Sequence, residues 1–203
     1  MEWLKFLDMV LVVFVVYIPL LIGKSRRSEE SVFWASVISL ILTVLVFFLI
    51  KTESVEFKEF GPISVIVAST FGFVTYGLYR LNFSWETKVY SPITWLALLP
   101  IIDNVIFRKY GLYYMSMLSQ KLQLLDWNIQ ENVIIVALLC AFIYFLVFVR
   151  KNAFQAIAEG AVAFILSIIA GHIYLIHGLF NAILAQSAFS FWRMVFACHP
   201  HSK

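Results

Sequence analysis

Long apolar segments, each close to the length of a membrane span, fill almost the whole chain and restrict what it can fold into. Hydrophobic residues make up 62% of the 203 positions and charged residues only 13%, whereas soluble domains carry about 25% charged residues. A helix needs about 20 apolar residues to cross a bilayer. We therefore expect an all-α, polytopic membrane helix bundle of about seven spans, at residues 6–22, 31–50, 62–81, 93–117, 132–149, 152–171 and 172–194.

These spans use nearly the full length, so no soluble catalytic domain is expected. Residues 1–203 are predicted to form one multi-pass integral membrane domain, with N-terminal spans in 1–92 and a core in 93–197. The net charge of +3 is small and scattered, which provides no surface for nucleic acid. The expected partners are membrane lipids and a peptide or membrane protein, and any active site must lie inside the bundle.

The segment 93–117 carries Asp103, Asn104 and Arg108 near its middle. An ionisable side chain at membrane depth costs at least a few kcal/mol, so such residues usually face a bundle interior or a wet cavity. On an α-helix, Asp103 and Arg108 would diverge by about 140°. Pro100 removes a backbone donor just before them and is expected to kink the helix. This segment is the first candidate for a functional site.

A second polar patch lies near the C-terminus, where His177 and Asn181 are four residues apart and share a helix face. Small residues favour close contact between membrane helices, and Gly72 and Gly77 are expected to provide it. Gly171 is expected to break the chain before the last helix. The sequence thus predicts two apolar helices that each present one polar patch.

At these two patches the chain resembles the CAAX prenyl protease and bacteriocin-processing (CPBP) family of intramembrane endopeptidases. The first motif of that family is two glutamates, three residues and an arginine, and the run from Asp103 to Arg108 stands in that register. The last motif, histidine followed four residues later by asparagine or aspartate, is matched by His177 and Asn181. The middle motif ends in a histidine where this chain has Val149. The resemblance covers roughly residues 93–184.

In that family, the first glutamate and the middle histidine activate water, and the last histidine and asparagine stabilise the oxyanion. The resemblance therefore implies that Asp103 is the general base, that Arg108 orients the water or substrate, and that His177 and Asn181 hold the oxyanion. Asn104 would contribute to binding. The implied activity is that of a divergent intramembrane endopeptidase, or a catalytically impaired relative, acting on a membrane-presented peptide.

Each polar group also has a structural interpretation. Asp103 and Arg108 would form an intramembrane ion pair or hydrogen-bonded clasp, and His177 and Asn181 an ordinary interhelical contact. Val149 in place of histidine favours a non-enzymatic membrane partner, which would be an immunity, scaffold or assembly subunit with a polar cavity for a peptide or lipid head group. A transporter is disfavoured by the short length and the lack of paired broken helices.

Two further residues are candidates for the binding site. Glu159 would be an added acid or a partner of Arg108, or simply a buried carboxylate paired with a basic side chain. His172 is a candidate replacement for the missing histidine, although five residues from His177 it points about 140° away. The chain has no HExxH motif and no metal-ligand spacing of its two cysteines, so no metal or cofactor is expected.

Overall fold

A computed structural model shows an all-α protein, which confirms the expected fold class. It describes residues 2–25, 29–49, 61–82, 92–122, 129–148 and 153–197. Five of the helices are α1 (Glu2–Ser25), α2 (Glu29–Leu49), α3 (Pro62–Asn82), α6 (Ile129–Phe148) and α7 (Ala153–Ala197). The central helix, between α3 and α6, is built from the consecutive elements η1 (Thr94–Leu98), α4 (Leu99–Asp103), η2 (Asn104–Gly111) and α5 (Leu112–Leu122).

The number of membrane spans differs from the expectation of about seven. Two helices of the described chain are long and apolar enough to cross a membrane, over Glu30–Phe48 and Ala156–Phe196. The apolar parts of α1, α3 and α6 are shorter, at Leu7–Gly23, Pro62–Leu78 and Glu131–Val147. The expected boundary between the spans 152–171 and 172–194 lies instead at Gly178, where α7 reverses direction. The prediction of about seven spans was therefore wrong.

Many large apolar side chains are exposed on the bundle, and several charged side chains are buried within it. Ile63 is 75% exposed and Phe48 74%, whereas Asp103 and Arg108 are each 1% exposed. In soluble proteins charged side chains are almost never fully buried unless they are paired, and large exposed apolar patches are rare. This combination of exposed large apolar side chains and buried charged ones is uncommon in a soluble domain.

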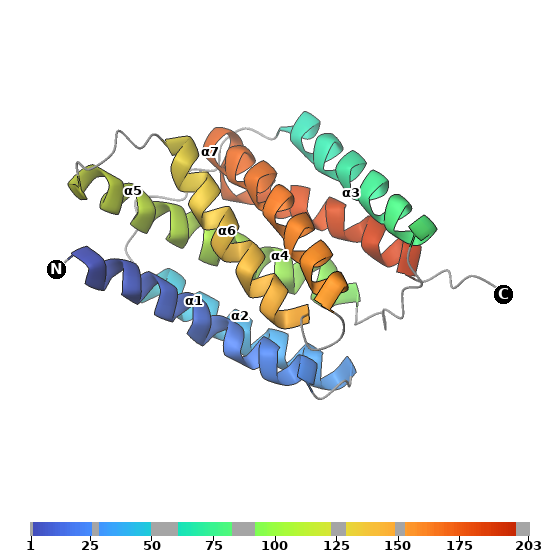
Figure 1. Cartoon of the computed structure of the whole chain (residues 1–203), viewed down its shortest axis with the longest axis horizontal. Helices are drawn as coiled ribbons and strands as arrows, with labels where there is room; N and C mark the ends of the chain where they lie inside the picture. The colour runs from blue at the N-terminus through green and yellow to red at the C-terminus, as the bar shows by residue number, and fades with distance from the viewer. Residues whose placement is uncertain are drawn as a thin grey trace.

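The helices pack in three close pairs, α1 with α2, α3 with α7, and α6 with α7 (Figure 1). Glycine residues allow the helices of two of these pairs to come into close contact. A Cβ added at Gly23 would lie 2.4 Å from the Cβ of Ala35, and one at Gly72 would lie 2.8 Å from the backbone oxygen of Phe189. The expected close contact at Gly72 is confirmed, whereas Gly77 leaves ordinary space, 3.8 Å from the Phe196 ring.

The reversal of the chain within α7 occurs at Gly178, which has φ 84° and ψ 178°. Figure 1 shows α7, coloured orange to red, turning back on itself. These dihedral angles belong to a region that is essentially restricted to glycine. The expected break at Gly171 was wrong, because Gly171 is helical and instead gives α7 a close contact with Val133 of α6.

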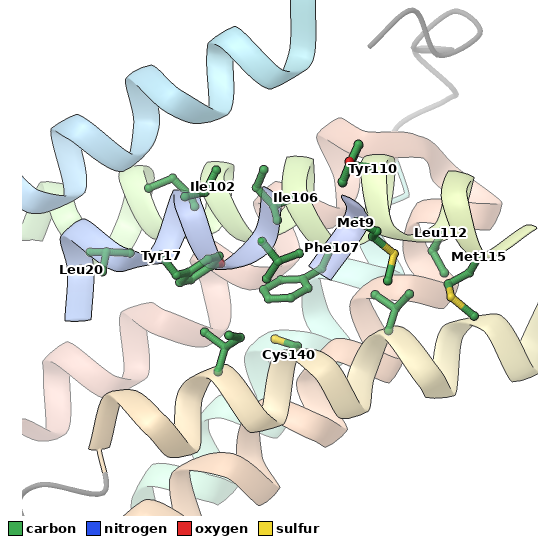
Figure 2. Packing of buried hydrophobic residues seen from close by; sticks show 14 of the residues in the cluster. Met9, Tyr17, Leu20, Ile102, Ile106, Phe107, Tyr110, Leu112, Met115 and Cys140 are labelled. Carbon is green, nitrogen blue, oxygen red and sulfur yellow. The ribbon is translucent and has the colours of Figure 1, made fainter. Parts of the chain in front are cut away.

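The apolar core lies between α1, the central helix and α6 (Figure 2). Ile106 and Phe107 are completely buried there, and the Phe107 ring lies 5.5 Å from the ring of Tyr17. Figure 2 also shows Cys140 of α6 facing this part of the core. Since Phe107 directly precedes Arg108 in the sequence, its packing helps to fix where the Arg108 side chain points.

Replacing Gly178 with alanine should destabilise the fold by about 1–3 kcal/mol, because alanine at this φ and ψ is strained. The matched variant Gly77→Ala should be neutral or slightly stabilising, since the added methyl group meets only an ordinary contact. Thermal unfolding of both purified variants in detergent micelles checks this. Equal melting temperatures for the two variants would contradict the reversal at Gly178.

Candidate functional site

Asp103 lies buried at the end of α4, and three side chains donate hydrogen bonds to its carboxylate. Tyr17 of α1 donates to Oδ1. Tyr144 of α6 and Gln186 of α7 donate to Oδ2 over 2.7 and 2.5 Å. These donors come from three different helices, so one carboxylate joins α1, α6 and α7 to the central helix. We call Asp103, Tyr17, Tyr144 and Gln186 the carboxylate clasp.

The π-helical geometry of η2 brings Arg108 back towards Asp103. In a π-helix the hydrogen bonds join residues i and i+5, so residues five apart come together instead of diverging as they would on an α-helix. Arg108 accordingly donates from Nη1 to the backbone oxygen of Asp103 over 3.2 Å. The expected divergence of these two residues was therefore wrong, because it assumed α-helical periodicity.

Pro100 is the second residue of α4, directly after the π-helix η1. A proline has no N–H, so Pro100 donates no hydrogen bond to a carbonyl of η1. Leu98 and Leu99 on either side of the junction keep helical dihedral angles. The irregularity at this point is therefore the wider winding of η1.

Gln186 connects the carboxylate clasp to Asn104. Its amide nitrogen donates to Asp103, and its amide oxygen accepts a hydrogen bond of 2.8 Å from Nδ2 of Asn104. Asn104 also donates to the backbone oxygen of Pro100 over 2.7 Å. Asn104 thus helps to hold the clasp together, and α7 contributes to it through a residue that the sequence reasoning did not select.

The side chains of Arg108 and Asp103 form no ion pair in the part of the chain that the structure describes. Arg108 is nevertheless buried, and its Nε has no hydrogen-bond acceptor there. An unsatisfied buried donor costs about 1–3 kcal/mol, and more when it is charged. A buried polar atom of this kind needs an explanation.

Glu159 and Arg193 form a buried ion pair between the two halves of α7. Both nitrogens of the guanidinium fork donate to the carboxylate, over 2.9 and 3.2 Å. In a straight helix the two residues would be about 51 Å apart at 1.5 Å per residue, so the pair depends on the reversal at Gly178. Trp95 of η1 covers the guanidinium, with its ring 4.0 Å from Cζ.

A small cavity lies between these two polar groups. Its walls include Asp103, Arg108, Glu159 and Arg193. The volume that the centres of water molecules can occupy is about 20 Å³, which is enough for one water molecule. Among the wall residues are also Trp95, Leu99, Cys140, Tyr144, Val162, Ala163, Leu166, Gln186, Phe189 and Ser190.

His177 and Asn181 lie at a different place, against the start of α3. The N–H of Gly61 donates to Oδ1 of Asn181 over 3.0 Å, and Nδ2 of Asn181 donates to the backbone oxygen of His177 over 2.7 Å. The His177 ring packs on Gly61 so closely that an added Cβ would lie 2.9 Å from it. Neither residue is among those that line the cavity.

The remaining candidates also have local partners. Nδ1 of His172 lies 2.9 Å from the backbone oxygen of Ile168 in the same helix, and His172 is not part of the cavity wall. Glu159 pairs with Arg193, which matches the sequence interpretation of a buried carboxylate held by a basic side chain. Val149, at the position of the middle-motif histidine, lies outside the described residues.

Sequence reasoning missed the donors of the carboxylate clasp and the partner of Glu159. Glu159 and Arg193 are the only acidic and the only basic residue of 153–197, histidines aside, and two lone opposite charges in an apolar helix are expected to pair. The sequence therefore contained a signal for the pairing of Glu159 with Arg193. Tyr17 and Tyr144 gave none, because tyrosine is common in any apolar bundle.

The arrangement supports binding more directly than proton transfer. Both carboxylates at the cavity already accept hydrogen bonds, Asp103 from three donors and Glu159 from two. A general base must contact the water that it deprotonates, and three donors leave Asp103 little capacity to accept another. No group of three or more potential metal ligands occurs in the described part of the chain.

No family model, curated protein or solved structure matches the chain. The resemblance to the CPBP family therefore depends on the residues of its two motifs alone.

Removing the hydroxyl group of Tyr17 tests the carboxylate clasp. Tyr17→Phe should lower the free energy of unfolding by about 1.5–3 kcal/mol, the range for a hydrogen bond to a charged group. In an Asp103→Ala background the same change should cost less, with a coupling of about 0.5–3 kcal/mol. Denaturant unfolding in mixed micelles measures all four proteins. Strict additivity would show that the two side chains do not interact.

The ion pair of α7 makes a second prediction. Arg193→Met alone should cost about 3–5 kcal/mol, because it leaves the buried Glu159 carboxylate uncompensated. Adding Glu159→Leu should recover much of this loss, since an apolar pair of similar volume replaces the ion pair. The same unfolding assay applies, and a double variant that is less stable than Arg193→Met would contradict the pairing.

Proposed function

We propose that the chain is a multi-pass integral membrane protein. Two of its helices have the length and composition of membrane spans, and large apolar side chains are exposed along α1, α2, α3 and α7. Burying such surfaces in lipid removes them from water, while the buried hydrogen bonds and the ion pair satisfy the carboxylates of Asp103 and Glu159 within the bundle. The cavity would then lie among helices that are surrounded by lipid.

Within that membrane protein, we propose a non-enzymatic role in which the cavity binds a polar group of a peptide or lipid. Such a protein would serve as an immunity, scaffold or assembly partner. The observation that carries this proposal is the unmatched Nε of Arg108 at a cavity whose carboxylates are already occupied. A site with a spare donor and no spare base is suited to binding.

The separation of the two motifs supports the same conclusion. In the implied proteolytic mechanism, His177 and Asn181 would donate to an oxyanion formed beside Asp103. Oxyanion donors must lie about 2.7–3.1 Å from that oxygen. Asn181 is instead held by Gly61 and the backbone of its own helix, and neither residue reaches the wall of the cavity.

A divergent CPBP-type endopeptidase is the second candidate. The observation that favours it is the cavity itself, which has room for one water molecule beside Asp103 and Arg108. In this role Asp103 would activate that water and Arg108 would orient it. Hydrolysis would require a rearrangement that frees Asp103 from at least one of its three donors and brings His177 and Asn181 to the substrate.

A cleavage assay separates the two candidates. The purified protein in micelles should not hydrolyse a farnesylated peptide with a CAAX ending, because its only carboxylate in the first motif is occupied. The variants Asp103→Ala and His177→Ala serve as controls for contaminating activity. Hydrolysis by the parent that both substitutions abolish would establish the endopeptidase and contradict the binding role.

The variant carrying Asp103→Glu and Val149→His provides a further comparison. It restores the glutamate and the histidine of the family motifs. A protease that has lost its catalytic groups should gain hydrolysis of the same farnesylated peptide, whereas a protein without that ancestry should gain none. Activity that rises only when both substitutions are present would identify the family relation even if the parent is inactive.

A further inference from the structure

Lys109 of η2 is a second buried cation, and it does not line the cavity. Its side chain is only 8% exposed, yet it forms no ion pair or hydrogen bond in the part of the chain that the structure describes. Its ammonium lies 3.6 Å from the centre of the Phe47 ring, in the last turn of α2. An aromatic ring attracts a cation but accepts none of the three N–H groups as an oxygen would. Lys109 therefore has donors for which the described chain supplies no acceptor.

The stem of Lys109 is buried, but its ammonium still reaches the surface. Among the described residues, the buried polar atoms that lack a partner include Nε of Arg108 but not Nζ of Lys109. Since Nζ has no hydrogen-bond partner either, it must retain some exposed area. Lysine side chains commonly bury their apolar stem while the charged head stays accessible. A ligand can therefore contact Nζ from outside the bundle, without entering a cavity.

Lys109 lies at the level where the apolar segments of α1 and α2 end. Phe47 is the second-last residue of the apolar segment of α2, and Leu7 is the first residue of that of α1. Asp8, which is exposed on α1, interacts electrostatically with Tyr110, the residue after Lys109. An exposed carboxylate is costly within the hydrocarbon region of a bilayer. Both helices therefore place Lys109 at the boundary between lipid and water.

From these contacts we infer that Lys109 binds the phosphate group of an anionic phospholipid at the edge of the membrane. This inference rests on the membrane location proposed above and concerns a site separate from the cavity. Phosphate oxygens accept strong hydrogen bonds from an ammonium. Anionic lipids also attract basic side chains that lie close to the membrane surface. The Phe47 ring holds the ammonium on the side of α2, where the phosphate would meet it.

The surface of α2 beside Phe47 suits the acyl chains of such a lipid. Leu45 and Phe48 are 52% and 74% exposed there, so acyl chains below the phosphate would run along apolar side chains. A free phosphate ion would gain nothing from them. A cation next to an exposed apolar surface therefore favours a phospholipid over a soluble phosphate.

Native mass spectrometry of the protein released from dodecyl maltoside micelles tests this inference. Phosphatidylglycerol is compared with phosphatidylcholine of the same acyl chains, which has no net charge, and with glycerol 3-phosphate, which has the phosphate without the chains. We expect phosphatidylglycerol to bind about fivefold more tightly than phosphatidylcholine, since one basic residue near an anionic surface contributes about 1 kcal/mol. Equal binding of the two lipids would overturn the inference, as would full competition by glycerol 3-phosphate, because the ligand would then be soluble phosphate.

Variants locate the site on Lys109. Lys109→Met should abolish the preference for phosphatidylglycerol, whereas Lys109→Arg should keep it because the charge remains. Phe47→Leu should weaken the preference, and the matched control Phe48→Leu should not, since Phe48 lies next to Phe47 but is not the ring beneath the ammonium. Melting curves show which variants fold. Full preference in folded Lys109→Met, or in folded Phe47→Leu should Lys109→Met not fold, would overturn the inference.

Extraction with alkaline carbonate distinguishes failure of this inference from failure of the proposed membrane location. The protein is first reconstituted into vesicles of phosphatidylcholine alone. If it resists extraction and yet binds both lipids equally, the lipid-phosphate inference is wrong and the membrane location stands. If carbonate releases it from the vesicles, the membrane location fails and this inference fails with it.

Discussion

A carboxylate that receives three hydrogen bonds inside an apolar bundle is the interaction on which the rest of this structure depends. Asp103 would be costly to bury alone, and its donors are supplied by α1, α6 and α7. Each of those helices is apolar along most of its length and could otherwise slide or rotate against its neighbours. The directional requirement of one charged group thus specifies an arrangement that non-directional apolar packing would leave open.

Two backbone irregularities make this arrangement attainable. The π-helix η2 returns Arg108 to the side of Asp103, and the glycine-only conformation of Gly178 folds α7 back so that Glu159 meets Arg193. π-helical turns often occur at functional sites. Here the two irregularities bring Asp103 and Arg108, and also Glu159 and Arg193, to the wall of a single cavity. Regular α-helices would have kept the members of each pair apart.

The sequence was informative about helices and less so about their contacts. The lengths of the apolar segments located the helices to within a few residues. Ionisable residues inside apolar segments are costly, and this identified Asp103, Arg108 and Glu159 as candidates. The expected divergence of Asp103 from Arg108 was wrong because it assumed a regular α-helix. The expected break at Gly171 was wrong because a different glycine, Gly178, reverses the chain. The clasp donors were not predictable, since Tyr17 and Gln186 are more than 80 positions from Asp103 and hydrogen bonds at such distances leave no periodic signal.

The cavity is lined by two carboxylates that already accept hydrogen bonds and by Arg108, whose Nε has no acceptor among the described residues. The central claim is that Asp103 joins three helices at once, and hydrogen–deuterium exchange in lipid nanodiscs tests it most directly. Comparison of the parent with Asp103→Ala should show faster exchange in α1, α6 and α7 together, because all three lose the same acceptor. Faster exchange confined to the central helix would contradict the account.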